Sequence, residues 1–152
     1  MKKFFVLILI PFSIFAQTQQ LKDFNQLFNS LKSGETVRAI IHYELCRLVI
    51  DGKEEVAPNA IGGMDLNTFE YFAKGSVRID NAFISVSETV LISHPRYGYV
   101  LNYVKLRIYE DDNVEIVARY LDPKTYEVKM DETFYTRINN GNNSGALFLY
   151  VK

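Results

Sequence analysis

The sequence contains a single cysteine, no tryptophan and only two histidines. Because Cys46 has no partner within the chain, an internal disulfide is excluded. Two interpretations of Cys46 stay open: a small buried apolar side chain, or a thiol that is reactive or forms an intermolecular disulfide. His42 and His94 are far apart and lack the HxxxH or CxxC spacing of metal ligands, so we expect no metal site and no cofactor.

Positive charge is not in excess either, since the chain has 17 basic and 18 acidic side chains. Without a run of Lys and Arg it lacks the basic surface that replaces phosphate counterions, so a nucleic-acid partner is not expected. The motifs GxxxxGKS/T, GxGxxG and GxSxG are absent as well. Their absence argues against phosphate-cradling loops, dinucleotide fingerprints and nucleophile elbows. Many hydrolases carry no local signature, so an enzyme stays open as a class.

An export signal is the first feature that is present. The opening residues MKKFFVLILIPFSIFA combine a basic start, a twelve-residue apolar stretch and a small residue, Ala16, before a polar run. This is the layout of a secretory signal peptide, and the apolar stretch is shorter than the roughly 20 residues that span a membrane. We expect a signal peptide over residues 1–16 and one mature domain over residues 17–152, in the periplasm or outside the cell. With 15 basic and 18 acidic side chains, the cleaved domain has a net charge of about −3 and no stable membrane insertion.

The mature part predicts one helix followed by strands. A single N-terminal helix is predicted by apolar residues at helical spacing: Leu21, Phe24, Leu27, Phe28 and Leu31. Gly34 is expected to end this helix. Beyond Gly34 the apolar residues alternate, with a change of parity at 44–46 that predicts a bulge or tight turn. Residues 50–65 are expected to form a long irregular connection. We predict a mostly β domain, an antiparallel meander of about eight strands closed as a barrel or folded as a sandwich, with the helix over an open end or face.

A hairpin in the middle of the chain places a carboxylate on the apolar face. Residues 69–79 and 82–92 alternate, and the Asp80-Asn81 pair between them predicts a two-residue type I′ turn. This register sets Glu88 opposite Ala73, within the apolar face. A buried carboxylate is costly unless it is hydrogen-bonded or paired, so Glu88 is a candidate site residue.

The next hairpin adds an amide to the same face. Pairing Ser93 with Tyr99 across the intervening loop puts Asn102 opposite Val90 and diagonal to Glu88. The two side chains could line a ligand cavity. Alternatively, Glu88 could form a structural hydrogen bond to Asn102, or a bulge could turn it outward.

The loop between Ser93 and Tyr99 contains the other binding candidates. Arg96 could present a bidentate donor to a carboxylate or phosphate, beside His94 and Tyr97. Tyrosines at 97, 99, 103 and 109 follow one strand and its loop, where they could stack on a sugar or protein, or be covered by a second layer. The acidic tip at 110–113 lacks the spaced pattern of a calcium loop, and an ordinary hairpin end is the alternative for the His94 loop.

Several extended strings of the chain resemble the VirK-like family of small exported proteins: IDGKEEVAPNAIGGM, FEYFAKGSVR, SETVLISHPRYGYV and LRIYEDDNVEI. The similarity runs from about residue 31 to 150. It implies a common fold and export, and it brings no catalytic residue with it.

Three functions follow from these residues. The leading hypothesis is a non-enzymatic ligand-binding or protein-interaction module, whose small molecule, glycan or protein ligand contacts Glu88, Asn102 or the loop with His94, Arg96, Tyr97 and Tyr99. The alternative is a small hydrolase or lyase that uses Glu88 as general base. The third is an oligomeric surface protein bridged through Cys46.

Overall fold

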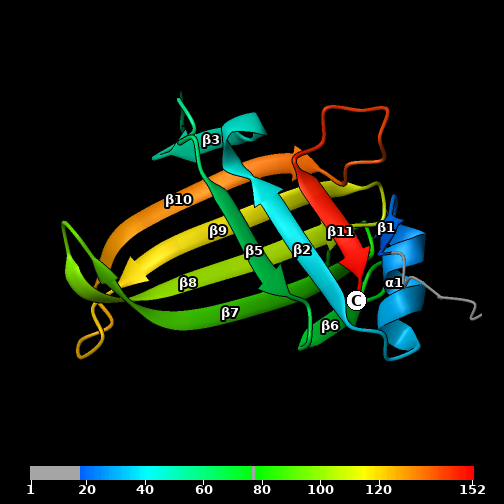
Figure 1. Cartoon of the computed structure of the whole chain (residues 1–152), viewed down its shortest axis with the longest axis horizontal. Helices are drawn as coiled ribbons and strands as arrows, with labels where there is room; N and C mark the ends of the chain where they lie inside the picture. The colour runs from blue at the N-terminus through cyan, green and yellow to red at the C-terminus, as the bar shows by residue number, and fades with distance from the viewer. Residues whose placement is uncertain (1–17, 77) are drawn as a thin grey trace, which may run out of the picture.

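The computed structural model describes residues 18–76 and 78–152, so the predicted signal peptide lies outside the described residues. The described chain forms two antiparallel sheets that pack face to face (Figure 1). The four-stranded small sheet has the order β1 (Gln19–Leu21), β11 (Leu147–Val151), β2 (Val37–His42) and β5 (Ile61–Asp65). The seven-stranded large sheet has the order β4 (Lys53–Glu55), β3 (Arg47–Ile50), β10 (Val128–Arg137), β9 (Asn113–Leu121), β8 (Gly98–Tyr109), β7 (Phe83–His94) and β6 (Phe69–Phe72).

This architecture confirms the prediction of a mostly β, antiparallel domain, and the open alternative resolves as a sandwich because the sheets do not close into a barrel. The predicted meander is the run from β6 to β10. The described residues contain eleven strands rather than about eight. Residues 50–65 hold β4 and β5, so the prediction of an irregular connection there was wrong. Charged residues in β4 and glycines in β5 have low strand propensity, which cross-strand pairing overrides here.

Helix α1 (Phe24–Lys32) lies at one end of the sandwich, as predicted (Figure 1). Its N-cap is Asp23, whose side chain accepts a hydrogen bond from the Gln26 N–H at 2.8 Å. The ring centre of Phe28 lies 4.3 Å from that of Tyr71 on β6, so the helix packs against this edge of the large sheet. The helix begins later than expected, because Leu21 belongs to β1. No helix in residues 18–76 and 78–152 is long and apolar enough to cross a membrane.

The core is built on one cross-strand row of the large sheet. Each residue of this row is buried and pairs with the next one on the adjacent strand, from β7 to β10: Val86, Leu106, Ile116 and Phe134. Alternate residues of β2 and β11 face them from the small sheet. The chain passes from the small to the large sheet through the 3₁₀ turn η1 (Tyr43–Leu45). This confirms the tight turn predicted from the change of parity.

The hairpin predicted around Asp80-Asn81 is wrong in its register. Phe69 pairs with Val86 rather than with Ile92, a shift of six residues, and β6 ends at Phe72. Residues 73–82 form the connection instead, except that residue 77 lies outside the described residues. An even shift leaves every side chain on its original face, so the alternation alone could not detect it. As a result Glu88 does not lie opposite Ala73: it lies past the start of β6, where Phe69 pairs with Val86.

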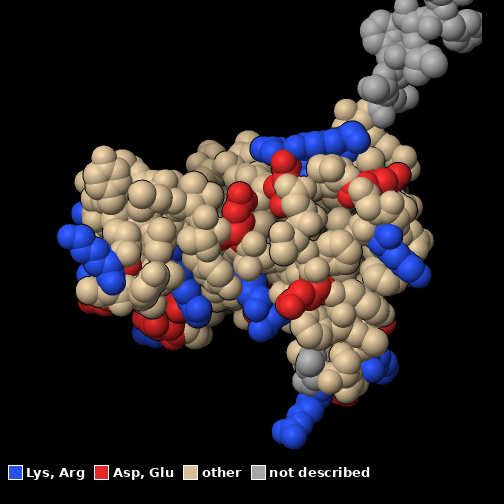
Figure 2. Space-filling model, turned by 90° about the horizontal axis from the view of Figure 1, so that it is seen from below, with Lys and Arg blue, Asp and Glu red and all other residues tan. Residues whose placement is uncertain are grey.

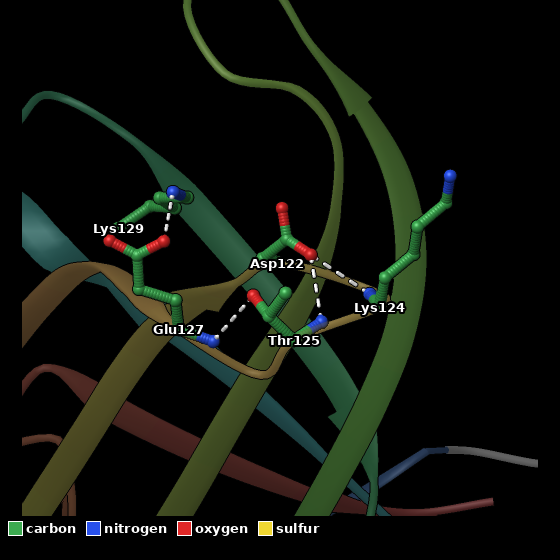
Figure 3. A network of polar contacts seen from close by, with 5 residues as sticks. All are labelled: Asp122, Lys124, Thr125, Glu127 and Lys129. Atoms are coloured by element: carbon green, nitrogen blue, oxygen red, sulfur yellow. Dashed lines mark hydrogen bonds and ion pairs between the residues drawn. The ribbon is translucent and has the colours of Figure 1, made fainter.

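The turn between β9 and β10 closes the far end of the large sheet. The Asp122 carboxylate accepts the N–H groups of Lys124 and Thr125, each at 2.9 Å (Figure 3). These backbone donors, Thr125 first, hold the pKa of Asp122 below its usual range. Lys129 pairs with Glu127 at 2.7 Å on the returning strand. This turn covers the connection between Leu121 at the end of β9 and Val128 at the start of β10.

Candidate functional site

A cleft of about 360 Å³ lies between the two sheets beyond the buried core row. Its floor comes from β7, β8, β9 and β10 of the large sheet. Its opposite wall comes from β2, β5 and the segment before β5. Both predicted interior polar residues, Glu88 and Asn102, line this cleft. A site of this size suits a small ligand.

The floor of the cleft consists of two cross-strand rows. The row next to the core is Glu88, Val104, Ala118 and Glu132, each paired with its neighbour on the adjacent strand. The second row is Val90, Asn102, Tyr120 and Met130, in the same strand order. The predicted pairing of Asn102 with Val90 is therefore confirmed. Carboxylates thus mark both ends of the inner row, with apolar side chains between them.

Glu88 is more accessible than the sequence predicted. Its residue is exposed, as are its neighbours on β7 from Ser87 to Leu91. The structure shows no hydrogen bond or ion pair between the Glu88 carboxylate and any residue in the described parts of the chain. The predicted structural bond to Asn102 is thus not formed. Both side chains are left for contacts with a ligand or solvent.

Glu132 is the second carboxylate of the cleft and is not among the candidate residues predicted from the sequence. It is half-buried on β10, and its burial raises the pKa of the carboxyl above the ordinary value. No residue within 18–76 or 78–152 forms a hydrogen bond or ion pair with its carboxylate. Its position between Met130 and Phe134 was a usable signal, because a charged residue there interrupts the apolar face of the strand.

Tyr43 closes the wall of the cleft opposite Glu132. Its ring lies 4.9 Å from that of Phe134, and a Cβ atom added to Gly62 would be 2.9 Å from its Cε2. Burial raises the pKa of Tyr43 to about 12, with further contributions from Cys46, Tyr120 and Glu132. The phenol is therefore neutral near pH 7 and can donate a hydrogen bond.

The His94 loop joins the cleft through Tyr120. The His94 ring lies 4.9 Å from both Tyr97 and Tyr120, and Tyr120 also lines the cleft. The backbone N–H of Arg96 donates to Nδ1 of His94 at 3.2 Å, which fixes the imidazole over the turn. The Arg96 guanidinium lies 5.3 Å from the centre of the Tyr97 ring. Three of the four loop candidates thus form one aromatic cluster at the rim.

Tyr99 lies apart from this cluster. It pairs with Ser93, on the sheet face opposite Asn102, and is 70% exposed. Tyr103 and Tyr109 share that outer face and are half-buried. The structure therefore separates Tyr99 from the other candidate binding residues.

Cys46 is buried and lies away from the surface. Its side chain is 8% exposed, its Sγ atom is 3.6 Å from the carbonyl oxygen of His42, and burial raises its pKa to about 11. These contacts favour the interpretation as a small apolar side chain. His42 is half-buried, and its ring lies 5.1 Å from that of Phe148.

The cleft contains negative but no positive side chains. Within the described chain, none of its lining residues is Lys, Arg or His, whereas Glu88 and Glu132 both line it. On the face shown in Figure 2, acidic and basic side chains are interspersed rather than gathered by sign. No group of three or more His, Cys, Asp or Glu in the described ranges could hold a metal ion. The one-sided charge of the cleft is therefore its main electrostatic feature.

Comparison with known families identifies the chain. The family model described as VirK protein matches residues 20–126, more than half of the sequence. The chain belongs to the VirK family. The crystal structure of lpg1832, a VirK family protein from Legionella pneumophila, has a TM-score of 0.65 and 13% identity, and the match covers 86% of this chain and 97% of that one. At this identity the likeness shows the fold alone. No match was found among curated proteins.

The family match includes most of the cleft of this VirK protein. Tyr43, Glu88, Asn102 and Tyr120 fall within the matched residues, whereas Glu132 on β10 lies beyond them. The inner row of the floor therefore combines residues from inside and outside the family match. The cleft of this VirK protein is therefore completed by β10, which follows the matched residues.

Proposed function

We propose that this VirK protein is an exported, non-enzymatic binding protein and that the cleft between its sheets holds a small ligand. The observation that carries the proposal is the half-buried carboxylate of Glu132, which has no partner among the described residues and faces an open, mostly apolar cleft. Desolvating a carboxylate without a partner costs stability. Such a cost is expected at a functional site, where a ligand supplies the missing partner.

The arrangement favours binding over catalysis. A general base works best when it is oriented toward its substrate and has a pKa near the working pH. Glu88, the base in the alternative hypothesis, is exposed and has no partner to orient it. The raised pKa of Tyr43 makes its phenol a hydrogen-bond donor rather than a proton carrier near neutral pH. These groups suit recognition of a bound molecule.

The test is a map of backbone amide shifts for protein expressed from the complete chain. Compounds of four kinds are added separately: an alkyl diamine, a monosaccharide, an alkyl carboxylate and a neutral amino acid. We expect at least one to shift the amides of Gly62, Gly63 and Ala118, which lie on opposite walls of the cleft. If every compound leaves these amides unmoved up to millimolar concentration, the proposal is contradicted.

Export is tested separately by the mass of the protein recovered outside the cytoplasm. The proposal is supported by the signal-like residues 1–16, and it predicts a mature chain that begins at Gln17. Retention of an intact N-terminus in the cytoplasm would contradict export and leave the binding proposal to its own test.

A further inference from the structure

The two carboxylates of the cleft differ from those on the outer face of the same sheet. On the outer face Glu115 pairs with Arg107 at 3.2 Å, and Asp131 pairs with Arg119 at 3.0 Å. In the cleft neither Glu88 nor Glu132 has a described partner, and no basic side chain of the described residues lines the space. Negative charge is thus compensated on one face and left uncompensated on the other.

The spacing of these carboxylates excludes a shared metal ion. Glu88 and Glu132 are paired through Val104 and Ala118, so three strand spacings separate them. At about 4.8 Å for each spacing, their Cα atoms are about 14 Å apart. Oxygen ligands of calcium lie at about 2.5 Å from the ion. One small cation cannot bridge the two side chains, whereas an elongated molecule can.

The lining between the carboxylates is suited to an aliphatic chain. Val104 and Ala118 are the two middle residues of the row that runs from Glu88 to Glu132. Ile41 and Met64 line the cleft from the small sheet. Asn102 and Tyr120 in the second row add an amide and a phenol that can accept a hydrogen bond from an N–H group along such a chain. Charged ends and an apolar middle are therefore both matched.

We infer that the cleft binds a linear diammonium compound of the polyamine class, with one ammonium at Glu88 and the other at Glu132. The inference rests on the proposed binding function of the cleft and specifies its ligand. The ammonium groups replace the missing partners of both carboxylates as charge-assisted hydrogen bonds. An anionic ligand is disfavoured because it would meet two like charges without a compensating cation.

Calorimetric titration of protein expressed from the complete chain tests this inference at low ionic strength. The ligands are spermidine, 1,5-diaminopentane, pentylamine and glutarate. We expect at least one of the two polyamines to bind, with pentylamine at least tenfold weaker and glutarate not detectable, because a monoamine engages one carboxylate only. Equal affinity for pentylamine and the polyamines would overturn two-point recognition.

Matched variants separate the cleft from general charge effects. Glu132→Gln and Glu88→Gln should each weaken polyamine binding about tenfold. Glu54→Gln, the same change at an exposed position of β4 outside the cleft, should alter it less than about twofold. Equal losses in all three variants would show attraction by net charge and overturn the inference.

The amide map distinguishes failure of this inference from failure of the proposed function. Shifts at Gly62 and Ala118 with the sugar, carboxylate or amino acid, but none with diamines, would overturn the polyamine assignment and leave a binding cleft. No shifts with any compound would overturn both.

Discussion

Glu88 and Glu132 occupy the two ends of one cross-strand row, with Val104 and Ala118 between them. The core row, Val86, Leu106, Ile116 and Phe134, lies two residues away along each strand and is fully apolar and buried. The sheet therefore changes from core to cleft within two residues along each strand. Site and core are therefore continuous parts of one sheet face.

Replacing Glu132 with Gln should stabilise the ligand-free protein at pH 7. Burial raises the pKa of Glu132, so the folded state binds its proton more tightly than the unfolded chain does. The stability from this group is complete below its unfolded pKa and is lost as the pH rises through its folded pKa. The gain from Gln should therefore be largest near pH 7 and vanish toward pH 3.

Urea unfolding of the wild type and Glu132→Gln at both pH values measures this difference. Glu54→Gln serves as the control, since an exposed carboxylate should show no such trend. A lower midpoint for Glu132→Gln at pH 7 would mean that the carboxylate stabilises the fold.

The sequence predicted which face each residue occupies better than which residues pair. Glu88 and Asn102 were assigned to one face, and both line the cleft. The Ser93–Tyr99 register was also correct, because a short loop restricts the pairing of its strands. The connection from 73 to 82 is longer and imposes no such restriction. Alternation was satisfied equally by the wrong register, since an even shift preserves the faces.

The other residues that line the cleft with Glu88 could not be predicted in the same way. Glu132 had a local signal, but its closeness to the cleft depends on the order of four strands. Tyr43 reaches the site from the turn between the two sheets. Its position follows from how one sheet packs on the other, and a period-two pattern contains no information about that packing.

Gly62→Ala should narrow the cleft by displacing Tyr43. The added Cβ would lie 2.9 Å from Cε2 of Tyr43, too close for the present ring position. The ring also contacts Phe134, so its movement should cost about 1 to 3 kcal/mol of stability. In a Tyr43→Ala background the cost of Gly62→Ala should largely disappear, because the clashing ring is absent. Chemical unfolding of the four proteins measures this coupling, and independent effects of the two changes would show that Tyr43 is not held against Gly62.

Asp112→Ala should loosen the helix from the large sheet. The Asp112 carboxylate accepts the N–H of Phe24 at 2.8 Å, which ties the first turn of α1 to the β8–β9 turn. Asp112 also has a positive φ of 65°, a conformation that Asn and Gly tolerate better than Ala. Thermal unfolding should show a loss of about 1 to 2 kcal/mol for Ala and less for Asn. Asp112→Gly removes the carboxylate without straining the positive φ, whereas Asn keeps an oxygen acceptor, so a Gly variant at least as stable as the Asn variant would mean that the hydrogen bond contributes nothing.

Cys46 should be unreactive in the folded protein. Its thiol is buried and has a pKa of about 11, so little thiolate forms at pH 8. Labelling with Ellman's reagent should be slow in buffer and fast in denaturant. On a non-reducing gel the exported protein should run as a monomer. A dimer band that reducing agent removes would instead support the intermolecular disulfide.

A crystal structure of the protein with spermidine would locate both ends of the bound ligand. We expect an extended ligand in the cleft, with its terminal nitrogens at Glu88 and Glu132 and its methylene groups over Val104 and Ala118. Spermidine bound at another surface, with the cleft unchanged, would contradict it.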